Sequence, residues 1–241
     1  MRLTDVGQDY LLHARRLIED FQQAEQVAAG AQAAPRGTLR VAAPLVFGRL
    51  HVLPVVAEYL TRHAQADVQL SLSDNVVNLV EEGFDVAVRI GTLPDSSLIA
   101  RRVGQVRRVV CASRDYLAAR GRPRRPADLA EHEAIVSSGL PGADTWVFHR
   151  QEREIAVTVR PRLMVNGAEP AMDAAAAGLG VARVLSYQLR PRMPGGNLIS
   201  ILDAWDDRIR PVSIVAPAGR FMPAKVRAFI DLAARILPAR L

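Results

Sequence analysis

The sequence predicts an α/β fold that is preceded by one long helix. Residues 38–91 alternate between strand-like runs, with apolar residues at every second position, and helix-like runs, with apolar residues every three or four positions. This alternation favours a mostly parallel sheet. Residues 2–30 form an amphipathic pattern of their own, ahead of the first strand.

The predicted first helix begins at Thr4, a suitable N-cap residue, and ends near Gly30. Its apolar residues follow the heptad spacing of a coiled coil. The seam consists of Tyr10, Ala14, Leu17, Phe21, Ala24 and Ala28. We expect it to pair with a second copy, because residues 31–37 then break the chain into a linker. The alternative is an amphipathic helix that lies on its own domain.

The first α/β segment contains three strands and two helices in alternation. Strands are predicted at 38–44, 68–74 and 84–91, and the middle one alternates apolar and polar side chains along most of its length. Helices are predicted at 47–63 and, shorter, at 75–83.

A second run of elements follows. It opens with a strand at 107–113 and a basic, proline-broken stretch at 120–132 that leads into a short helix. Residues 146–165 predict two strands joined by a polar hairpin at 151–153. The remaining elements are a helix at 168–180, strands at 180–185, 197–202 and 211–217, and a last amphipathic helix that starts at Pro223.

Composition narrows the class of protein. The chain has 241 residues and a net charge of +6, which permits binding to nucleic acid or to acidic metabolites. No apolar run is long enough to span a membrane, and Asp5, Gln8 and Asp9 fall where a signal peptide would be apolar. We therefore expect a cytoplasmic protein without membrane contact. Cys111 is the only cysteine, which excludes an internal disulfide, and we expect it to be buried.

The motifs of common enzyme classes are absent from this sequence. It contains no phosphate-binding Gly-rich loop ending in Lys-Ser/Thr, no Gly-x-Ser-x-Gly elbow and no His-Glu-x-x-His pair. The five histidines are scattered. We therefore predict no catalytic residue, no metal site and no cofactor.

Four strand-to-helix turns carry small or polar residues, at 42–48, 73–78, 136–142 and 165–171. Free N–H groups at helix starts bind anions, and ligands of open α/β sheets collect at the carboxyl ends of strands. Each turn alone fits ordinary capping, but together they predict a small-molecule site between two lobes. Arg89 and Arg183 interrupt apolar strands and are either paired structural residues or a fork for an acidic effector.

The order of these segments resembles the LysR-type transcriptional regulators. The matching segments cover the chain almost from end to end. They are RLTDVGQDYLLHARRLI at 2–18, GTLRVAAP at 37–44, the run from 53 to 101, PADLAEH at 126–132, the run from 165 to 189 and PAKVRAFIDLAARIL at 223–237.

The resemblance implies a two-lobed, periplasmic-binding-protein-like (type 2) effector domain after a linker and dimerisation helix at 1–30. Lobe I would hold 36–111 and 213–241, lobe II would hold 112–212, and two crossing strands would form the hinge. The effector contacts that the resemblance implies are Leu45, Val46, Phe47, Ser73, Asp74, Arg89, Ile90, Gly91, Ser137, Ser138, Asn166, Gly167, Ala168 and Arg183.

The same resemblance implies a function. A small effector, expected to be anionic and to carry a carboxylate, would bind between the lobes of a homodimer or tetramer and control transcription. Promoter DNA would be contacted through a winged helix-turn-helix, which these residues do not contain. Two alternatives are a solute-binding protein of a transport system and an α/β enzyme that works in the same cleft.

Overall fold

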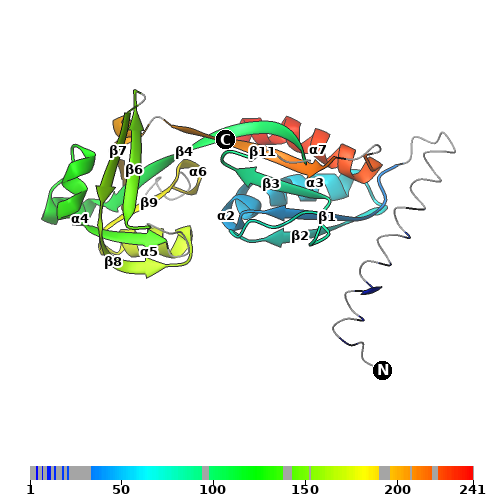
Figure 1. Cartoon of the computed structure of the whole chain (residues 1–241), viewed down its shortest axis with the longest axis horizontal. Helices are drawn as coiled ribbons and strands as arrows, with labels where there is room; N and C mark the ends of the chain where they lie inside the picture. Colours follow the sequence, from blue (N-terminus) through cyan, green and yellow to red (C-terminus); the bar gives the residue numbers. More distant parts are fainter. Residues whose placement is uncertain are drawn as a thin grey trace.

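The structure is a computed structural model that describes residues 4, 7, 10, 11, 14, 18, 21, 34–93, 98–137, 143–151, 153–189, 196–206, 208–218 and 222–240. Two lobes lie side by side and are joined by two long strands (Figure 1). The two-lobed α/β architecture predicted from the sequence is therefore confirmed.

One continuous sheet runs through both lobes. Its described strands lie in the order β2 (Ala66–Leu72), β1 (Gly37–Ala43), β3 (Val86–Ile90), β11 (Ile209–Pro217), β4 (Leu98–Ser113), β9 (Val181–Leu185), β5 (Glu133–Ser137) and β8 (Arg160–Val165). The outer strands pair in parallel within each lobe, whereas β11 and β4 pair antiparallel with each other and with their neighbours. These two antiparallel strands are therefore the connection between two parallel half-sheets.

Lobe I is closed by helices on one face of its half-sheet. They are α2 (Leu45–Phe47), the π-helical turn η1 (Gly48–Val52), α3 (Leu53–Arg62), α7 (Ala224–Ile236) and the 3-10 turn η5 (Leu237–Arg240). The rings of Tyr59 on α3 and Phe229 on α7 meet edge to face with centroids 5.7 Å apart, and both are fully buried. The sequence-distant α7 therefore completes the core of the first lobe.

In lobe II, both faces of the half-sheet are covered by other elements. The antiparallel hairpin of β6 (Thr145–Arg150) and β7 (Arg153–Thr158) covers one face, and α5 (Ala168–Ala176) covers the other. Cys111 is fully buried on the α5 side, as expected, and burial raises the pKa of its thiol to about 12. The shorter elements of this lobe are α4 (Arg114–Arg120), the 3-10 turn η2 (Pro126–Glu131), α6 (Ser186–Leu189), β10 (Leu198–Ile201), which pairs with β4, and the 3-10 turn η4 (Asp203–Trp205).

The two cores meet along β4. Val103 and Val106 belong to the core of lobe I, whereas Val109 and Val110 belong to the cores of lobe II. The pairing of β4 with β11 shifts register between Val212 and Ser213, which is the mark of a β-bulge at the crossing. The lobe limits at 111 and 213 stay a prediction.

Several predicted elements differ from the structure. Residues 75–83 form turns instead of a short helix, and the strand expected at 107–113 begins at Leu98. Polar side chains explain the turns, because Asn75 N donates to Ser73 Oγ over 3.1 Å and Val80 N donates to Asn78 Oδ1 over 3.2 Å. Such local bonds compete with a helix. Residues 146–165 contain three strands, not two, because β7 and β8 are separate.

Part of the predicted first helix is described. Gly7, Tyr10, Leu11, Ala14, Ile18 and Phe21 are helical, whereas Leu17, Ala24 and Ala28 of the predicted seam lie outside the described residues. The side chains of Tyr10 and Phe21 are 76% and 65% exposed. Two aromatic residues on this segment are therefore not covered by the lobes of their own chain.

Candidate functional site

The first side of the candidate site is the start of α2. Leu45 N donates to Asp74 Oδ1 over 3.0 Å, so the turn after β2 and the start of the helix meet. Leu45 is exposed, whereas Val46 and Phe47 are buried in the core of lobe I. Because the Asp74 carboxylate already lies at this helix start, a second anion here would meet a like charge.

Gly48 allows this helix to start close to the sheet. A Cβ at Gly48 would lie 2.1 Å from Leu72 Cδ2 and 3.3 Å from the Cβ of Ala43. The first turn of α2 therefore rests directly on the ends of β1 and β2, which fixes the position of Leu45 and Asp74.

The end of β3 is held by lobe I itself. Arg89 Nη2 donates to Val77 O over 2.8 Å, and Gly91 N donates to Pro211 O over 2.9 Å. Gly91 has a φ of 115°, which favours glycine. Ile90 is half-buried against the core of lobe I. The described contacts of Arg89 thus hold the turns of 75–83 to the sheet.

The second side of the site comes from lobe II. β5 and β8 run parallel with Ser137 beside Val165, so their carboxyl ends lie together with the following Asn166. Gly167 is the N-cap of α5 in extended backbone, and no side chain caps this helix start. Ala168 is its first residue. Ser138 lies outside the described residues. The start of α5 therefore keeps backbone N–H groups without a capping side chain.

An ion pair joins the two lobes beside these helix starts. Arg49 Nη2 on η1 lies 2.5 Å from Glu169 Oε1 on α5, and the two side chains are 54% and 32% exposed. Neither residue belongs to a pattern that predicts a site. No local signal could have found the pair, because 120 positions separate its members.

Tyr187 makes a second contact between the lobes. This residue of α6 packs into the core of lobe I, with its ring 5.2 Å from that of Phe47 and 5.5 Å from that of His51, centroid to centroid. Burial, followed by the nearby charge of Asp74, raises the pKa of the Tyr187 hydroxyl. The phenol is therefore neutral and anchors lobe II to the helix that starts at Leu45.

Arg183 does not contact the strand-to-helix turns with which it was expected to form one site. Its Nη2 is 2.5 Å from Asp206 Oδ2 and 2.6 Å from Val147 O, and its guanidinium stacks 4.6 Å from the ring centre of Phe148. These contacts support the alternative of a paired structural residue. No described contact connects Arg183 to the starts of α2 or α5.

Two general features of the described residues bear on function. None of their His, Cys, Asp and Glu side chains gather in a group of three or more that could hold a metal ion. None of their helices is long and apolar enough to cross a membrane.

Comparison with known proteins gives a consistent picture. Residues 32–237 match the family model described as the LysR substrate binding domain. The chain is 28% identical to the probable HTH-type transcriptional regulator LtrA of Klebsiella pneumoniae, over 99% of this chain and 78% of that protein. It is 31% identical to the HTH-type transcriptional regulator PtxR of Pseudomonas aeruginosa, over 96% and 74%.

A solved structure has the same architecture. The structure of CrgA, a LysR-type transcriptional regulator from Neisseria meningitidis, superposes with a TM-score of 0.76 at 25% identity, covering 98% of this chain and 80% of that one. The relatives are regulators of transcription, which favours this function over transport. With two lobes, a substrate-binding domain over most of its length and these relatives, the chain belongs to the LysR family of transcriptional regulators.

Proposed function

We propose that this chain is the sensing and pairing part of a regulator that acts in the cytoplasm, and that a small effector binds between the starts of α2 and α5. The observation that carries the proposal is the pair of contacts that join the lobes here, Arg49 with Glu169 and Tyr187 with Phe47. An effector that favours one lobe arrangement shifts the population toward it, because its affinity differs between the arrangements.

The two helix starts differ in what they offer an anion. The start of α2 already faces the Asp74 carboxylate, whereas no side chain caps the start of α5 and the Glu169 carboxylate in its first turn is paired with Arg49. We therefore infer that the effector's carboxylate faces Gly167 and Ala168, where backbone N–H groups and the helix dipole favour negative charge. Its apolar part would face the exposed Leu45. Arg183 is not needed for this arrangement.

The first helix would carry the signal to a second copy of the chain. Tyr10 and Phe21 are exposed and lie 11 positions apart, which is close to three helical turns and so the same face. A seam of this kind supports pairing into a homodimer, with a tetramer as a larger assembly. We propose that effector binding changes the geometry of that assembly on promoter DNA, without enzymatic turnover.

The test is a thermal-shift screen of the purified chain against small carboxylates, aromatic acids, amino acids and neutral metabolites. A ligand at about 100 times its dissociation constant stabilises the fold by about 2.7 kcal/mol. The variant Ala168→Pro removes one N–H at the first position of α5, where proline is tolerated. Ala224→Pro makes the same change at the first position of α7 and serves as the control.

The expected result is a selective shift by a carboxylate that Ala168→Pro weakens and Ala224→Pro preserves. Equal shifts in both variants would place the anion elsewhere. A screen in which no class of compound stabilises the chain would contradict the sensing role.

A further inference from the structure

A group of arginines on one face of the sheet is not used by the proposed effector site. Arg183 on β9 lies beside Val110 of β4, and Arg210 on β11 lies beside Val106 of β4. Arg108 is the residue between those two positions on the same face of β4, since side chains two apart share a face. Three neighbouring strands thus bring three guanidinium groups together where the sheet passes from lobe II to lobe I.

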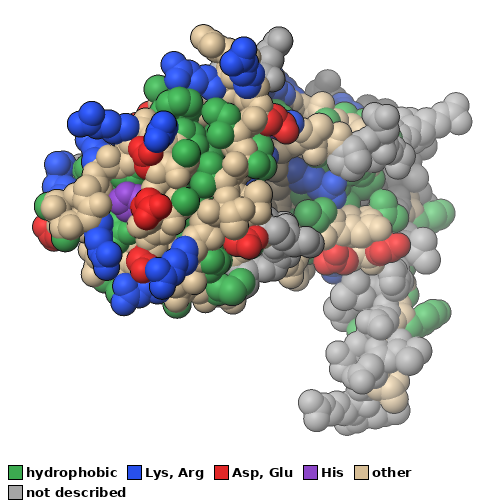
Figure 2. Space-filling model, turned by 60° about the vertical axis from the view of Figure 1, so that its left-hand side comes forward, with side chains coloured by type: hydrophobic (Ala, Val, Ile, Leu, Met, Phe, Trp, Pro, Cys, Tyr) green, Lys and Arg blue, Asp and Glu red, His purple; other side chains and the backbone are tan. Residues whose placement is uncertain are grey.

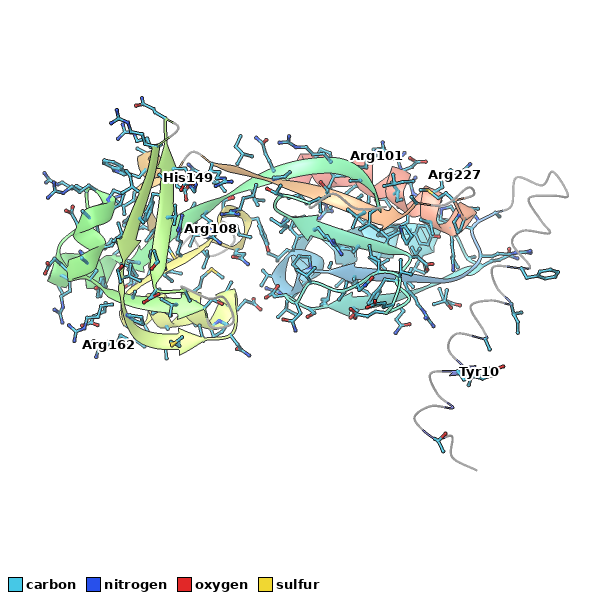
Figure 3. The ribbon with its side chains drawn as sticks, viewed as in Figure 1. Tyr10, Arg101, Arg108, His149, Arg162 and Arg227 are labelled. Atoms are coloured by element: carbon cyan, nitrogen blue, oxygen red, sulfur yellow. The ribbon has the colours of Figure 1, made fainter. Side chains whose placement is uncertain are left out.

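Figure 3 labels Arg108 on β4 and His149 on the β6–β7 hairpin; His149 Nδ1 lies 3.8 Å from the Asp206 carboxylate, which also acts on Arg108. Figure 2 shows the outer side of lobe II, where basic side chains lie mainly around the rim and acidic side chains are interspersed among them. Arg108 and Arg210 are half-buried, so the group has access to solvent.

The described residues of this group include few carboxylates. Asp206 is the described carboxylate that pairs with Arg183, and the two side chains are 8% and 5% exposed. His149 Nδ1 lies 3.8 Å from the same Asp206, while His149 Nε2 contacts Glu154 and Arg208. Within the described residues, Arg108 and Arg210 form no ion pair within 4.0 Å. Among the described residues, Asp206 is thus the one carboxylate that acts on all three arginines, and it cannot neutralise them all.

Arg183 also has hydrogen-bonding capacity to spare. Its Nη2 donates to Asp206 and Val147, but its Nε and Nη1 are buried and donate to no described residue. Buried donors of this kind are rare, because their desolvation costs free energy unless they find an acceptor. Nε and Nη1 lie on different edges of the guanidinium, so each offers a single hydrogen bond to an acceptor.

The electrostatics of the group agree with its geometry. Burial, followed by the charges of Arg210 and Arg183, lowers the pKa of Arg108 to about 10. The pKa values of Arg183 and Arg210 are also lowered, chiefly by burial. Arg210 and Arg183 thus both disfavour the charged form of Arg108, Asp206 offsets this in part, and a bound anion would relieve the remaining repulsion.

We propose that Arg108, Arg183 and Arg210 form a second anion site on the neighbouring strands β4, β9 and β11. This site binds a small divalent oxyanion such as a phosphate group. The site is separate from the helix starts of the proposed effector site. It lies on β4 and β11, the strands that join the lobes, so an anion bound there contacts the hinge itself. The shared chemistry is that of the phosphate group, whether as the free ion or as a phosphomonoester.

The test is a titration of the purified chain with inorganic phosphate and with methyl phosphate at constant ionic strength. Calorimetry and thermal shift would be recorded at low millimolar concentration, where the general stabilising effect of phosphate salts is small. The variants are Arg108→Gln and Arg210→Gln. Arg162→Gln, at an exposed position of β8 toward the far edge of lobe II (Figure 3), removes the same charge and is the control.

We expect saturable binding with one site in the wild type and in Arg162→Gln. Losing one charged hydrogen-bond partner should weaken the affinity by about tenfold or more in Arg108→Gln and Arg210→Gln. Tighter binding of methyl phosphate would identify a phosphorylated metabolite, and tighter binding of inorganic phosphate the free ion. Equal binding in all variants, or no saturable binding at all, would overturn the proposal.

A second measurement guards against misfolded variants. Because the three cations repel one another, Arg108→Gln without phosphate should melt at the same temperature as the wild type or higher. A lower melting temperature without phosphate would show that Arg108 is a stabilising structural residue and would contradict the site. Arg183 is not substituted, since its loss would remove the nearest ion-pair partner of the buried Asp206.

Discussion

Arg49 of lobe I and Glu169 of lobe II form an ion pair of 2.5 Å across the line where the two lobes meet. The pair lies at the start of α5, beside the helix end that we assign to the effector's carboxylate. Both partners are partly exposed, so the pair can break and form again as the lobes move, at little cost in free energy.

We predict a weak, salt-sensitive coupling between these two residues. A double-mutant cycle with Arg49→Gln and Glu169→Gln, measured by urea denaturation, should give a coupling of about 0.2–1 kcal/mol. It should shrink toward zero in about 1 M salt, where charges are screened over about 3 Å. A coupling that salt leaves unchanged would contradict the picture of an exposed pair.

Tyr187 should contribute far more to stability than this ion pair. Tyr187→Ala removes a buried ring that packs on Phe47 and His51, and should cost about 3–5 kcal/mol of unfolding free energy. Tyr187→Phe keeps the ring and loses only the hydroxyl, whose contact with Gln188 Nε2 is 3.3 Å long, so about 1 kcal/mol or less is expected. Equal losses in the two variants would mean that the hydroxyl, not the ring, joins the lobes.

Stability should fall in mild acid because of His132. Its imidazole is buried and Nδ1 lies 3.2 Å from the Tyr116 hydroxyl, and burial lowers the pKa of His132. As pH falls below about 6.5, His132 binds a proton in the unfolded chain but stays neutral in the folded chain. The contribution of His132 is thus complete above that pH and is lost below it.

The measurement is the unfolding free energy between pH 7 and pH 5 for the wild type and for His132→Gln. The wild type should lose more, with an extra slope of at most about 1.4 kcal/mol per pH unit. Parallel curves for the two proteins would show that His132 does not carry the dependence.

Cys111 should be inert in the folded chain. Its thiol is fully buried and the pKa is raised to about 12, so almost no reactive thiolate exists near neutral pH. Alkylation with iodoacetamide at pH 8, followed by mass spectrometry, should label the chain only after denaturation. Rapid labelling of the native protein would indicate that lobe II opens around β4.

The first helix should control assembly. Phe21→Glu places a charge on the predicted seam and should shift the chain toward monomer in analytical ultracentrifugation. Gln22→Glu adds the same charge one position along, off the seam, and should leave the assembly intact. Dissociation by both variants would indicate a general charge effect, and dissociation by neither would remove this helix from the interface.

Local patterns predicted most of the fold, and long-range pairing explains most of what they missed. The alternation in 68–74 and the amphipathic pattern after Pro223 became β2 and α7. The pattern at 75–83 predicts a helix, but the segment forms turns, because Ser73 and Asn78 bond to the nearby backbone. The strand-to-helix turns that border the candidate site could also be identified from the sequence.

The contacts that join the lobes could not be predicted from the sequence. Tyr187 lies on the four-residue α6, too short to show a periodic pattern, and it finds its partners in another lobe. Arg183 stands out in the sequence as a charged residue in an apolar strand. Its partner Asp206 cannot be identified from the sequence, because it lies 23 positions away. A sequence shows that a buried charge needs a partner, and it does not show which one the fold supplies.

The most direct test of the central claim is hydrogen–deuterium exchange of the chain with and without the strongest carboxylate from the screen. An effector bound between the lobes should slow exchange at 45–49 and at 167–171 together, because those amides start the two facing helices. Protection of both segments, at ligand concentrations that follow the measured affinity, is the predicted result. Protection confined to one lobe, or to the strands around Arg108, Arg183 and Arg210, would contradict a site between the lobes.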